Sequence, residues 1–169
     1  VPHKSEFGLV ALGVQSADVA ATIFESQRKK LTEMKVSHEG IIVAAMSRGR
    51  HECMVGARFD PVFGPVVMIG AGGKYVEALK DYAVLLPPFN LEQVEVALRG
   101  LRMAPLLDGV RGDAPMDVKA FAQVAVSVGR LMMAAGSSIA SLDLNPVMVG
   151  AVDEGAVVVD ALLERGGRS

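Results

Sequence analysis

The residue types best suited to chemistry stand near the end of the chain, in the stretch Leu142–Pro146. Two leucines alternate there with Asp143 and Asn145, whose side chains carry oxygen atoms. In a β-strand successive side chains point to opposite faces, so Asp143 and Asn145 would share one face. Carboxylate and amide oxygens, with positions left for water and phosphate, are ligands that Mg²⁺ accepts. The pattern predicts a strand face that could hold a metal ion, although side chains that merely face solvent would give the same pattern.

A second carboxylate comes from the strand expected to pair with this one. If residues 152–155 form the turn of a hairpin, Ala151 opposes Ala156, and Asp160 lies diagonally from Asn145 on the same face. Diagonal neighbours are about 7–8 Å apart between their backbones, close enough for both side chains to grip one cation. The expectation depends on register, because a slip of one residue would turn one side chain to the other face.

The stretch Gly70–Gly73 has three glycines in four positions and follows an expected strand. It is not a Walker A loop, since Gly73-Lys74 is followed by Tyr75, and a dinucleotide fingerprint would need a glycine at that same position. Backbone without side chains can approach a phosphate or another chain closely. Taken alone, the glycines favour the alternative of an ordinary tight turn.

His3 and Cys53 are the other residues whose chemistry matters. His3 stands among acidic and basic neighbours just before an expected strand, and such a histidine can carry a phosphoryl group or shuttle protons. An exposed terminal histidine would look the same. Cys53 is the single cysteine, which excludes an internal disulfide and a zinc site built from several cysteines. It is consistent with a reducing cytoplasm, where we expect the protein to be.

The composition is typical of one folded domain and excludes several classes of partner. The chain has 169 residues, of which 51% are hydrophobic, and a formal net charge of −2, which suits a compact domain rather than a disordered chain. Near-neutral charge with two tyrosines and no tryptophan argues against nucleic acid, which needs a basic face and aromatic platforms. We see no apolar run of membrane-spanning length and no signal-peptide pattern, so no membrane is expected.

Strands and helices are expected to be mixed without strict alternation. The expected strands are Phe7–Val14, Ile41–Met46, Glu52–Phe59, Val66–Ile69, Ile139–Val149 and Ala156–Leu163. The expected helices are Ala17 to about Met34 after the cap Ser16, Asn90 to about Arg102, and Asp117–Ala135. This order predicts α/β or α+β layering rather than a doubly wound Rossmann sheet.

Several of these signals occur together in the order of a known family. The chain resembles the ATP-grasp region of ADP-forming acetate-CoA synthetases and related acyl-CoA synthetases, and more distantly the β subunits of succinyl-CoA synthetase. The segments that carry the resemblance are His3–Gly8, Ile42–Met46, Glu52–Gly56, Phe63–Gly73, Leu79–Asp81, Pro105–Gly112 and Leu142–Pro146. They extend over nearly the whole chain. The resemblance implies that residues 1–169 are a partial ATP-grasp domain, a mixed sheet with flanking helices whose N-terminal part is missing.

The resemblance also implies a reaction. In that family, acyl-CoA, ADP and phosphate interconvert with carboxylic acid, CoA and ATP through an acyl phosphate and a phosphohistidine. The ATP-grasp domain would bind ATP or ADP with Mg²⁺, whose ligands would be Asn145 and Asp160, with Asp143 in support. His3 would be a second phosphoryl carrier, and catalysis would consist mostly of positioning and charge neutralisation.

Further positions would face the nucleotide or the partner domain if the resemblance holds. Glu52 would contact the nucleotide from the strand after the hinge. The hinge beside the adenine would comprise Val43, Ala44, Ala45 and Met46. The loops that face phosphate or the partner domain would contain Gly72, Gly73 and Arg111.

The chain departs from the family in several places. The strand and lysine expected before His3 are absent, Leu9 replaces a glycine, and Ala44-Ala45 replaces the hinge pair Gln-Pro. The CoA-binding and ligase domains would lie on the same polypeptide or on a partner subunit, in an oligomer, so this part alone is expected to be inactive. Two alternatives stay open: a regulatory or structural ATP-grasp-like module of a larger protein, such as a fused lysine acetyltransferase, and a scaffold that holds a partner subunit without binding nucleotide.

Overall fold

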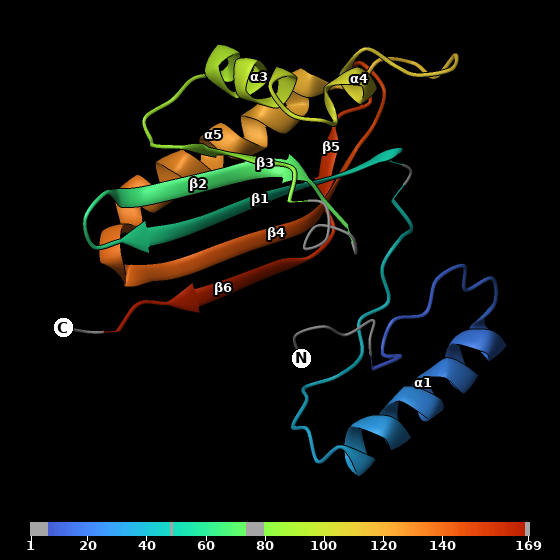
Figure 1. The fold of residues 1–169 in the computed structure, drawn as a ribbon. Helices are drawn as coiled ribbons and strands as arrows, with labels where there is room; N and C mark the ends of the chain where they lie inside the picture. Colours follow the sequence, from blue (N-terminus) through green and yellow to red (C-terminus); the bar gives the residue numbers. More distant parts are fainter. Residues whose placement is uncertain (1–6, 48, 74–79, 168–169) are drawn as a thin grey trace. The chain divides into compact units, whose positions relative to one another are not determined.

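The structure, a computed structural model, describes residues 7–47, 49–73 and 80–167. Its contacts divide the chain into two units, Val1–Met46 and Ser47–Ser169. The first unit contains helix α1, and the second contains the sheet and its helices (Figure 1). Each unit is described by itself.

The first unit consists of one helix between two segments without regular secondary structure. Helix α1 spans Ala17–Glu33 and begins where expected. The Ser16 hydroxyl accepts a hydrogen bond from the Val19 N–H at 3.3 Å, which satisfies one of the unpaired amides of the first helical turn. Among the described residues of this unit only Gln27 and Leu31 are buried, so it has almost no core of its own.

The strands expected at Phe7–Val14 and Ile41–Met46 are not formed, and these two predictions were wrong. A strand exists only where a second backbone exchanges hydrogen bonds with it. No segment within residues 7–46 pairs with either stretch, and Leu12, Ile42 and Val43 are exposed. Apolar patterning indicates that a segment suits a buried strand, but it does not supply the partner.

The second unit is built on a six-stranded sheet with the order β3-β2-β1-β4-β5, in which β6 also pairs with β4 (Figure 1). The strands are β1 (His51–Asp60), β2 (Gly64–Ala71), β3 (Tyr82–Leu85), β4 (Ile139–Val149), β5 (Ala156–Val158) and β6 (Ala161–Arg165). Every pair among them is antiparallel. The predicted class of layered helices and sheet is confirmed. Strand β3 was not expected, and the expected last strand is divided into β5 and β6.

The helices of the second unit are α3 (Leu91–Arg99), α4 (Ala104–Leu107) and α5 (Val118–Ala135), which a short 3₁₀ turn follows. Helix α3 begins with the predicted capping box, in which the Asn90 and Gln93 side chains each accept the other's backbone N–H at 2.9 Å. It ends earlier than expected, at Arg99, and α4 was not expected. Helix α5 is capped by the Asp117 carboxylate, which accepts the Ala120 N–H at 3.0 Å.

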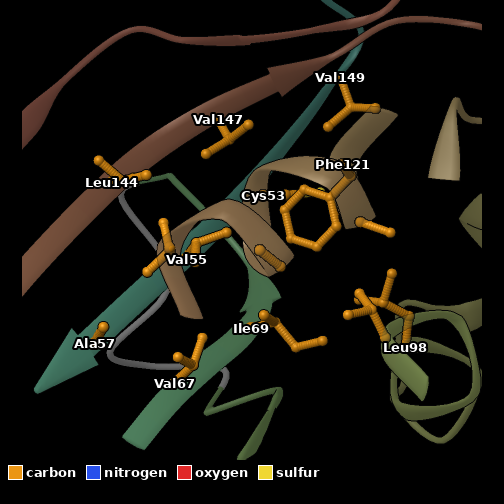
Figure 2. Close-up of a cluster of buried hydrophobic side chains, with 14 of the residues drawn as sticks. Cys53, Val55, Ala57, Val67, Ile69, Leu98, Phe121, Leu144, Val147 and Val149 are labelled. Atoms are coloured by element: carbon orange, nitrogen blue, oxygen red, sulfur yellow. The ribbon is translucent and has the colours of Figure 1, made fainter. Parts of the chain in front are cut away.

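Helix α5 packs on one face of the sheet and forms the core with it. The Phe121 ring is fully buried, and the labelled side chains of β1, β2 and β4 point to the same side as Phe121 and Leu98 of α3 (Figure 2). None of the described helices α3, α4 and α5 lies on the opposite face of the sheet (Figure 1), and we call it the open face.

Helix α5 explains one apolar run that the sequence analysis overlooked. Residues 118–138 form a helical segment long and apolar enough to cross a membrane by length and composition alone. The buried face of α5, with Phe121, Ala125, Val128 and Met132 against the sheet, accounts for that composition because a core helix needs the same apolar residues.

Phe121→Ala is expected to lower the free energy of unfolding by about 3–5 kcal/mol, because it removes a buried ring and leaves a cavity. Phe63→Ala removes the same group from the exposed β1–β2 turn, where the side chain is 68% exposed, and should change stability by less than about 0.5 kcal/mol. Denaturant unfolding of both variants measures the difference. Equal losses would show that the core is not where the structure places it.

Candidate functional site

The hairpin register brings Asn145 and Asp160 directly opposite each other. Val149 pairs with Ala156, whereas the sequence analysis expected Ala151 at that place, so the register differs by two residues. A shift of two keeps every side chain on its own face. The Asn145 N–H donates to the Asp160 carbonyl at 3.2 Å, which makes the two residues direct cross-strand neighbours rather than diagonal ones.

The turn between β4 and β5 explains the shift. The Ala151 N–H donates to the Glu154 carboxylate at 2.8 Å instead of to a strand partner. The backbone hydrogen bond next to the turn is therefore the one that the Gly150 N–H donates to the Gly155 carbonyl at 2.9 Å. The Asp117 carboxylate also accepts the Gly155 N–H at 3.0 Å, so the start of α5 holds the turn in this register.

A bulge in β4 lets Asn145 face the open face while the valines after it still face the helix side. The pairing of β4 with β1 shifts by one residue between Cys53 and Val55, so that Asn145 and Pro146 together oppose Met54. The extra residue restores the alternation after the bulge. Leucines before it and valines after it are all buried on the helix side, while Asn145 lies on the other side.

Two positions of the stretch Gly70–Gly73 have to be glycine, because backbone atoms of neighbouring segments lie too close to leave room for a side chain. A Cβ atom at Gly70 would overlap the Asp81 carbonyl oxygen, and one at Gly72 would overlap the Cys53 carbonyl oxygen. These contacts are with backbone rather than with flexible side chains, so neither neighbour can move aside easily. The glycines therefore have a packing reason that is independent of any ligand.

Gly73 connects two of the predicted site residues. Its N–H donates to the Asn145 Oδ1 atom at 2.9 Å. Its φ is +77°, and a Cβ atom there would overlap the Glu52 carboxylate. The neighbouring Gly72 N–H donates to the Glu52 carbonyl at 2.8 Å. Because both amides are already bonded within the protein, this loop holds Glu52 and Asn145 in place rather than offering these two N–H groups to a phosphate.

Two carboxylates on the open face repel each other. Asp143 is exposed, yet partial loss of solvent around its carboxyl group raises its pKa, and the negative charge of Asp160 raises it further. A cation between the two groups would remove this repulsion, and the Asn145 amide adds a third oxygen donor of the kind that Mg²⁺ accepts. In the described part of the chain, Asp, Glu, His and Cys side chains nowhere gather in threes around a possible metal position, so water and phosphate would complete the coordination.

The other predicted site residues belong to other parts of the chain. His3 lies outside the described residues. Residues 43–46 belong to the first unit, where they are exposed and without regular structure. Arg111 lies in the loop between α4 and α5 with a φ of +55°, and it is exposed. The structure thus brings together Glu52, the glycine loop and the three metal-ligand candidates.

Cys53 follows Glu52 directly but has no part in the site. Its side chain points into the core and is fully buried, 4.0 Å from the Met116 sulfur. Burial raises the pKa of the Cys53 thiol to about 12, so the thiol stays protonated and unreactive at physiological pH.

Three carboxylates that the sequence analysis did not assign to the site hold its framework. Asp117 and Glu154 bond the β4–β5 turn, and Asp81 accepts the backbone N–H groups of Arg102 and Met103 at 2.9 and 2.8 Å. Asp81 stood in a segment that carries the family resemblance, but acidic residues near turns are common and gave no signal of these contacts.

Comparison with known proteins identifies the domain family to which this site belongs. A family model described as an ATP-grasp domain matches residues 1–164. An open sheet face with Asn145, Asp143 and Asp160 beside a glycine loop is thus part of a nucleotide-binding class of domain. The chain belongs to the ATP-grasp domain family, as its sequence motifs predicted. Within that family, its relatives include ADP-forming acyl-CoA ligases.

The relatives are longer than this chain. A trans-feruloyl-CoA synthase from an unknown prokaryotic organism is 36% identical over 163 residues, which are 95% of this chain and 23% of that protein. The β subunit of ADP-forming acetate–CoA ligase II from Pyrococcus furiosus is 32% identical over 161 residues, 94% of this chain and 68% of the subunit. The chain therefore spans about a quarter of the first relative and about two thirds of the second.

Solved structures share the fold. The PH1788 protein of Pyrococcus horikoshii Ot3 has a TM-score of 0.90 at 28% identity, covering 98% of this chain and 71% of that chain. A Ca. Korarchaeum cryptofilum dinucleotide-forming acetyl-coenzyme A synthetase, in complex with coenzyme A and Mg-AMPPCP, has a TM-score of 0.82 at 29% identity, covering 96% of this chain and 70% of that chain.

Asp143→Asn is expected to raise the free energy of unfolding of the metal-free protein at neutral pH. The folded state holds the pKa of Asp143 above its unfolded value, so the ionised carboxylate lowers stability at every pH above both values, and the neutral amide does not. The gain should stay below about 1 kcal/mol because the group is partly solvated.

The pH dependence is the decisive part of this measurement. As pH falls through the raised pKa, the wild-type carboxyl group becomes protonated and its difference from asparagine should vanish. Denaturant unfolding in the presence of a chelator, over a series of pH values, follows this change. Asp113→Asn in the exposed loop before α5 is the matched control. A gain that persists unchanged in acid would contradict repulsion between Asp143 and Asp160.

Proposed function

We propose that this chain is the nucleotide- and Mg²⁺-binding part of an ADP-forming acyl-CoA ligase. Such an enzyme converts a carboxylic acid, CoA and ATP to acyl-CoA, ADP and phosphate. The observation that carries the proposal is the direct pairing of Asn145 with Asp160, beside Asp143, on the open face of an ATP-grasp domain. The relatives named as ADP-forming acetate–CoA ligases support it.

The site residues have separate tasks in this proposal. Asn145 and Asp160 would hold Mg²⁺ through side-chain oxygens, with Asp143 in support, and the bound metal would neutralise charge on the nucleotide phosphates. Glu52 would contact the nucleotide, while the Gly73 N–H keeps the Asn145 side chain in place and the Gly72 N–H bonds the Glu52 backbone. Phosphoryl transfer requires little covalent chemistry from the protein, so positioning would provide most of the catalysis.

His3 is the proposed carrier of the phosphoryl group. In the direction of ligation, a ring nitrogen of His3 would attack the γ-phosphorus of ATP and release ADP. The phosphoryl group would then pass to a second histidine and on to the acid, forming an acyl phosphate that CoA cleaves to acyl-CoA and phosphate. The related Korarchaeum synthetase, described with a phosphohistidine segment pointing towards its nucleotide binding site, is the precedent for such a relay.

The remaining domains and the setting of the enzyme are part of the proposal. CoA-binding and ligase domains would stand on the same polypeptide or on a partner subunit, in an oligomer in the cytoplasm. Both arrangements have parallels among the relatives. The Pyrococcus furiosus protein is a separate β subunit. An ADP-forming ligase of Archaeoglobus fulgidus, 36% identical over 161 residues, matches this chain over only 23% of its own length.

A second candidate function is a regulatory or structural ATP-grasp-like module of a larger protein. Leu9 in place of a glycine and Ala44-Ala45 in place of the hinge pair favour it, because they remove a close backbone approach and a polar group beside the base. The two candidates differ in turnover, since a module that only senses nucleotide would bind it without supporting ligation.

Asp160→Ala in the intact protein is expected to weaken binding of MgATP and MgADP by at least about tenfold, because it removes one of the three metal-ligand candidates. Glu164→Ala, which removes an exposed carboxylate from the next strand, should leave the affinity within about twofold. Calorimetric titration with and without Mg²⁺ measures both variants. Absence of nucleotide binding by the wild-type protein would favour a structural module.

His3→Ala in the intact protein is expected to abolish formation of acyl-CoA while leaving MgATP affinity nearly unchanged, because the histidine carries the phosphoryl group rather than the nucleotide. The assay supplies ATP, CoA and a panel of carboxylic acids and detects ADP and acyl-CoA. Full turnover of the variant would refute this role for His3. Failure of the wild-type protein with every acid would favour the regulatory module.

A further inference from the structure

We infer that Asp81 is a positioning residue for Asn145. It connects the helix layer to the end of β2, so that the Gly72–Gly73 backbone stays where it fixes the Asn145 amide. This inference rests on the proposed function for its meaning in catalysis, but the contacts that carry it belong to the protein without ligand. Among the described residues, Asp81 forms its hydrogen bonds with Ala71, Arg102 and Met103 rather than with the metal-ligand candidates.

The carboxylate of Asp81 is bonded to the helix layer. One oxygen accepts the Arg102 N–H at 2.9 Å and the other accepts the Met103 N–H at 2.8 Å. Both amides lie in the turn between α3 and α4, just before α4 begins at Ala104. Hydrogen bonds to an ionised acceptor are stronger than those between neutral groups, so this residue is attached firmly to the helices.

The main chain of Asp81 is bonded to the end of β2. Its carbonyl accepts the Ala71 N–H at 3.1 Å, and this approach is so close that Gly70 has no room for a Cβ atom. The preceding residue, Lys80, has a φ of +48°, which places a left-handed turn of the backbone just before the contact. One residue thus joins the helix layer through its side chain and the sheet through its backbone.

The two residues after Ala71 connect the end of β2 to the site by hydrogen bonds. The Gly72 N–H donates to the Glu52 carbonyl at 2.8 Å, and the Gly73 N–H donates to Asn145 Oδ1 at 2.9 Å. An amide oxygen can accept at two positions, so Oδ1 can keep the Gly73 N–H and still bind a metal ion. The hydrogen bond also decides which end of the amide faces the metal. Displacement of Gly73 would let the Asn145 amide rotate.

The test compares Asp81→Asn with Asp60→Asn in the intact protein. Asp60 is a matched control, because its carboxylate also accepts two backbone N–H groups, from Val62 at 2.8 Å and Phe63 at 3.1 Å. It stands at the opposite end of the β1–β2 hairpin, where it pairs with Gly64. Both variants keep the size of the side chain, but they differ in the bonds they lose. Asp60 accepts both N–H groups through Oδ1, so D60N can keep them and controls for the loss of one charge, whereas D81N must lose one of its two backbone bonds.

Two readouts separate positioning from a general loss of stability. In the protein without nucleotide, hydrogen exchange of a peptide that includes Gly72 and Gly73 should become at least about tenfold faster in D81N and stay unchanged in D60N. The affinity for nucleotide with Mg²⁺ should fall by about 10–100-fold in D81N, while the affinity for nucleotide without metal changes by less than about twofold. Asp81→Glu, which keeps both acceptor oxygens, should retain more of the Mg²⁺-dependent affinity than D81N.

The outcomes distinguish this inference from the proposed function. Unchanged exchange at Gly72 and Gly73 in D81N, or the same change in D60N, would overturn the role of Asp81. Faster exchange in D81N alone, in a protein whose wild-type form binds no nucleotide, would support the positioning role and count against the proposed function. Faster exchange with undiminished Mg²⁺-dependent affinity would show that Asn145 does not need this support, and would also overturn the inference.

Discussion

Strand β4 has to face the helix layer with apolar side chains along its whole length and still present an amide to the open face. The bulge opposite Met54 makes both possible, because one extra residue reverses the alternation between Leu144 and Val147. Without it, either the second half of β4 would turn its valines to solvent, or Asn145 would be buried. Asn145 can therefore accept the Gly73 N–H on the open face while Val147 and Val149 stay in the core.

The electrostatics of the open face follow from the same arrangement. Cross-strand pairing places Asn145 beside Asp160, and Asp143, two residues earlier on the same strand, feels the charge of Asp160. A framework of neutral hydrogen bonds thus holds two like charges near each other, which is unfavourable without a cation and favourable with one. The β4–β5 turn contributes from outside the site, because Glu154 and Asp117 keep the register that makes the pairing direct.

Features that depend on local sequence were predictable, and features that depend on distant partners were not. The helix starts after Ser16 and Asn90 followed from side chains that bond the next turn of backbone. The family was predictable from the order of its motifs. Asp143 and Asn145 were assigned to the correct strand, whereas Asp160 lies between β5 and β6 instead of inside one strand. The register was wrong by two residues because no sequence pattern reveals the hydrogen bond that the Ala151 N–H donates to the Glu154 carboxylate. The apolar stretch Ile41–Met46 suggested a strand, yet apolar residues cannot indicate whether a pairing backbone exists.

The crowding around the glycine loop constrains how this protein can change over evolutionary time. Gly70 is confined by the backbone of Asp81, and Gly73 by the carboxylate of Glu52 and by its own left-handed φ. A shorter residue at position 52 would relieve the side-chain conflict at Gly73 but not the strain of its left-handed φ, and the backbone conflict at Gly70 has no such partial remedy. Descendant sequences should therefore keep glycine at position 70 above all and rarely replace it at position 73, for reasons of space and backbone conformation that would hold even in a lineage that had stopped binding nucleotide.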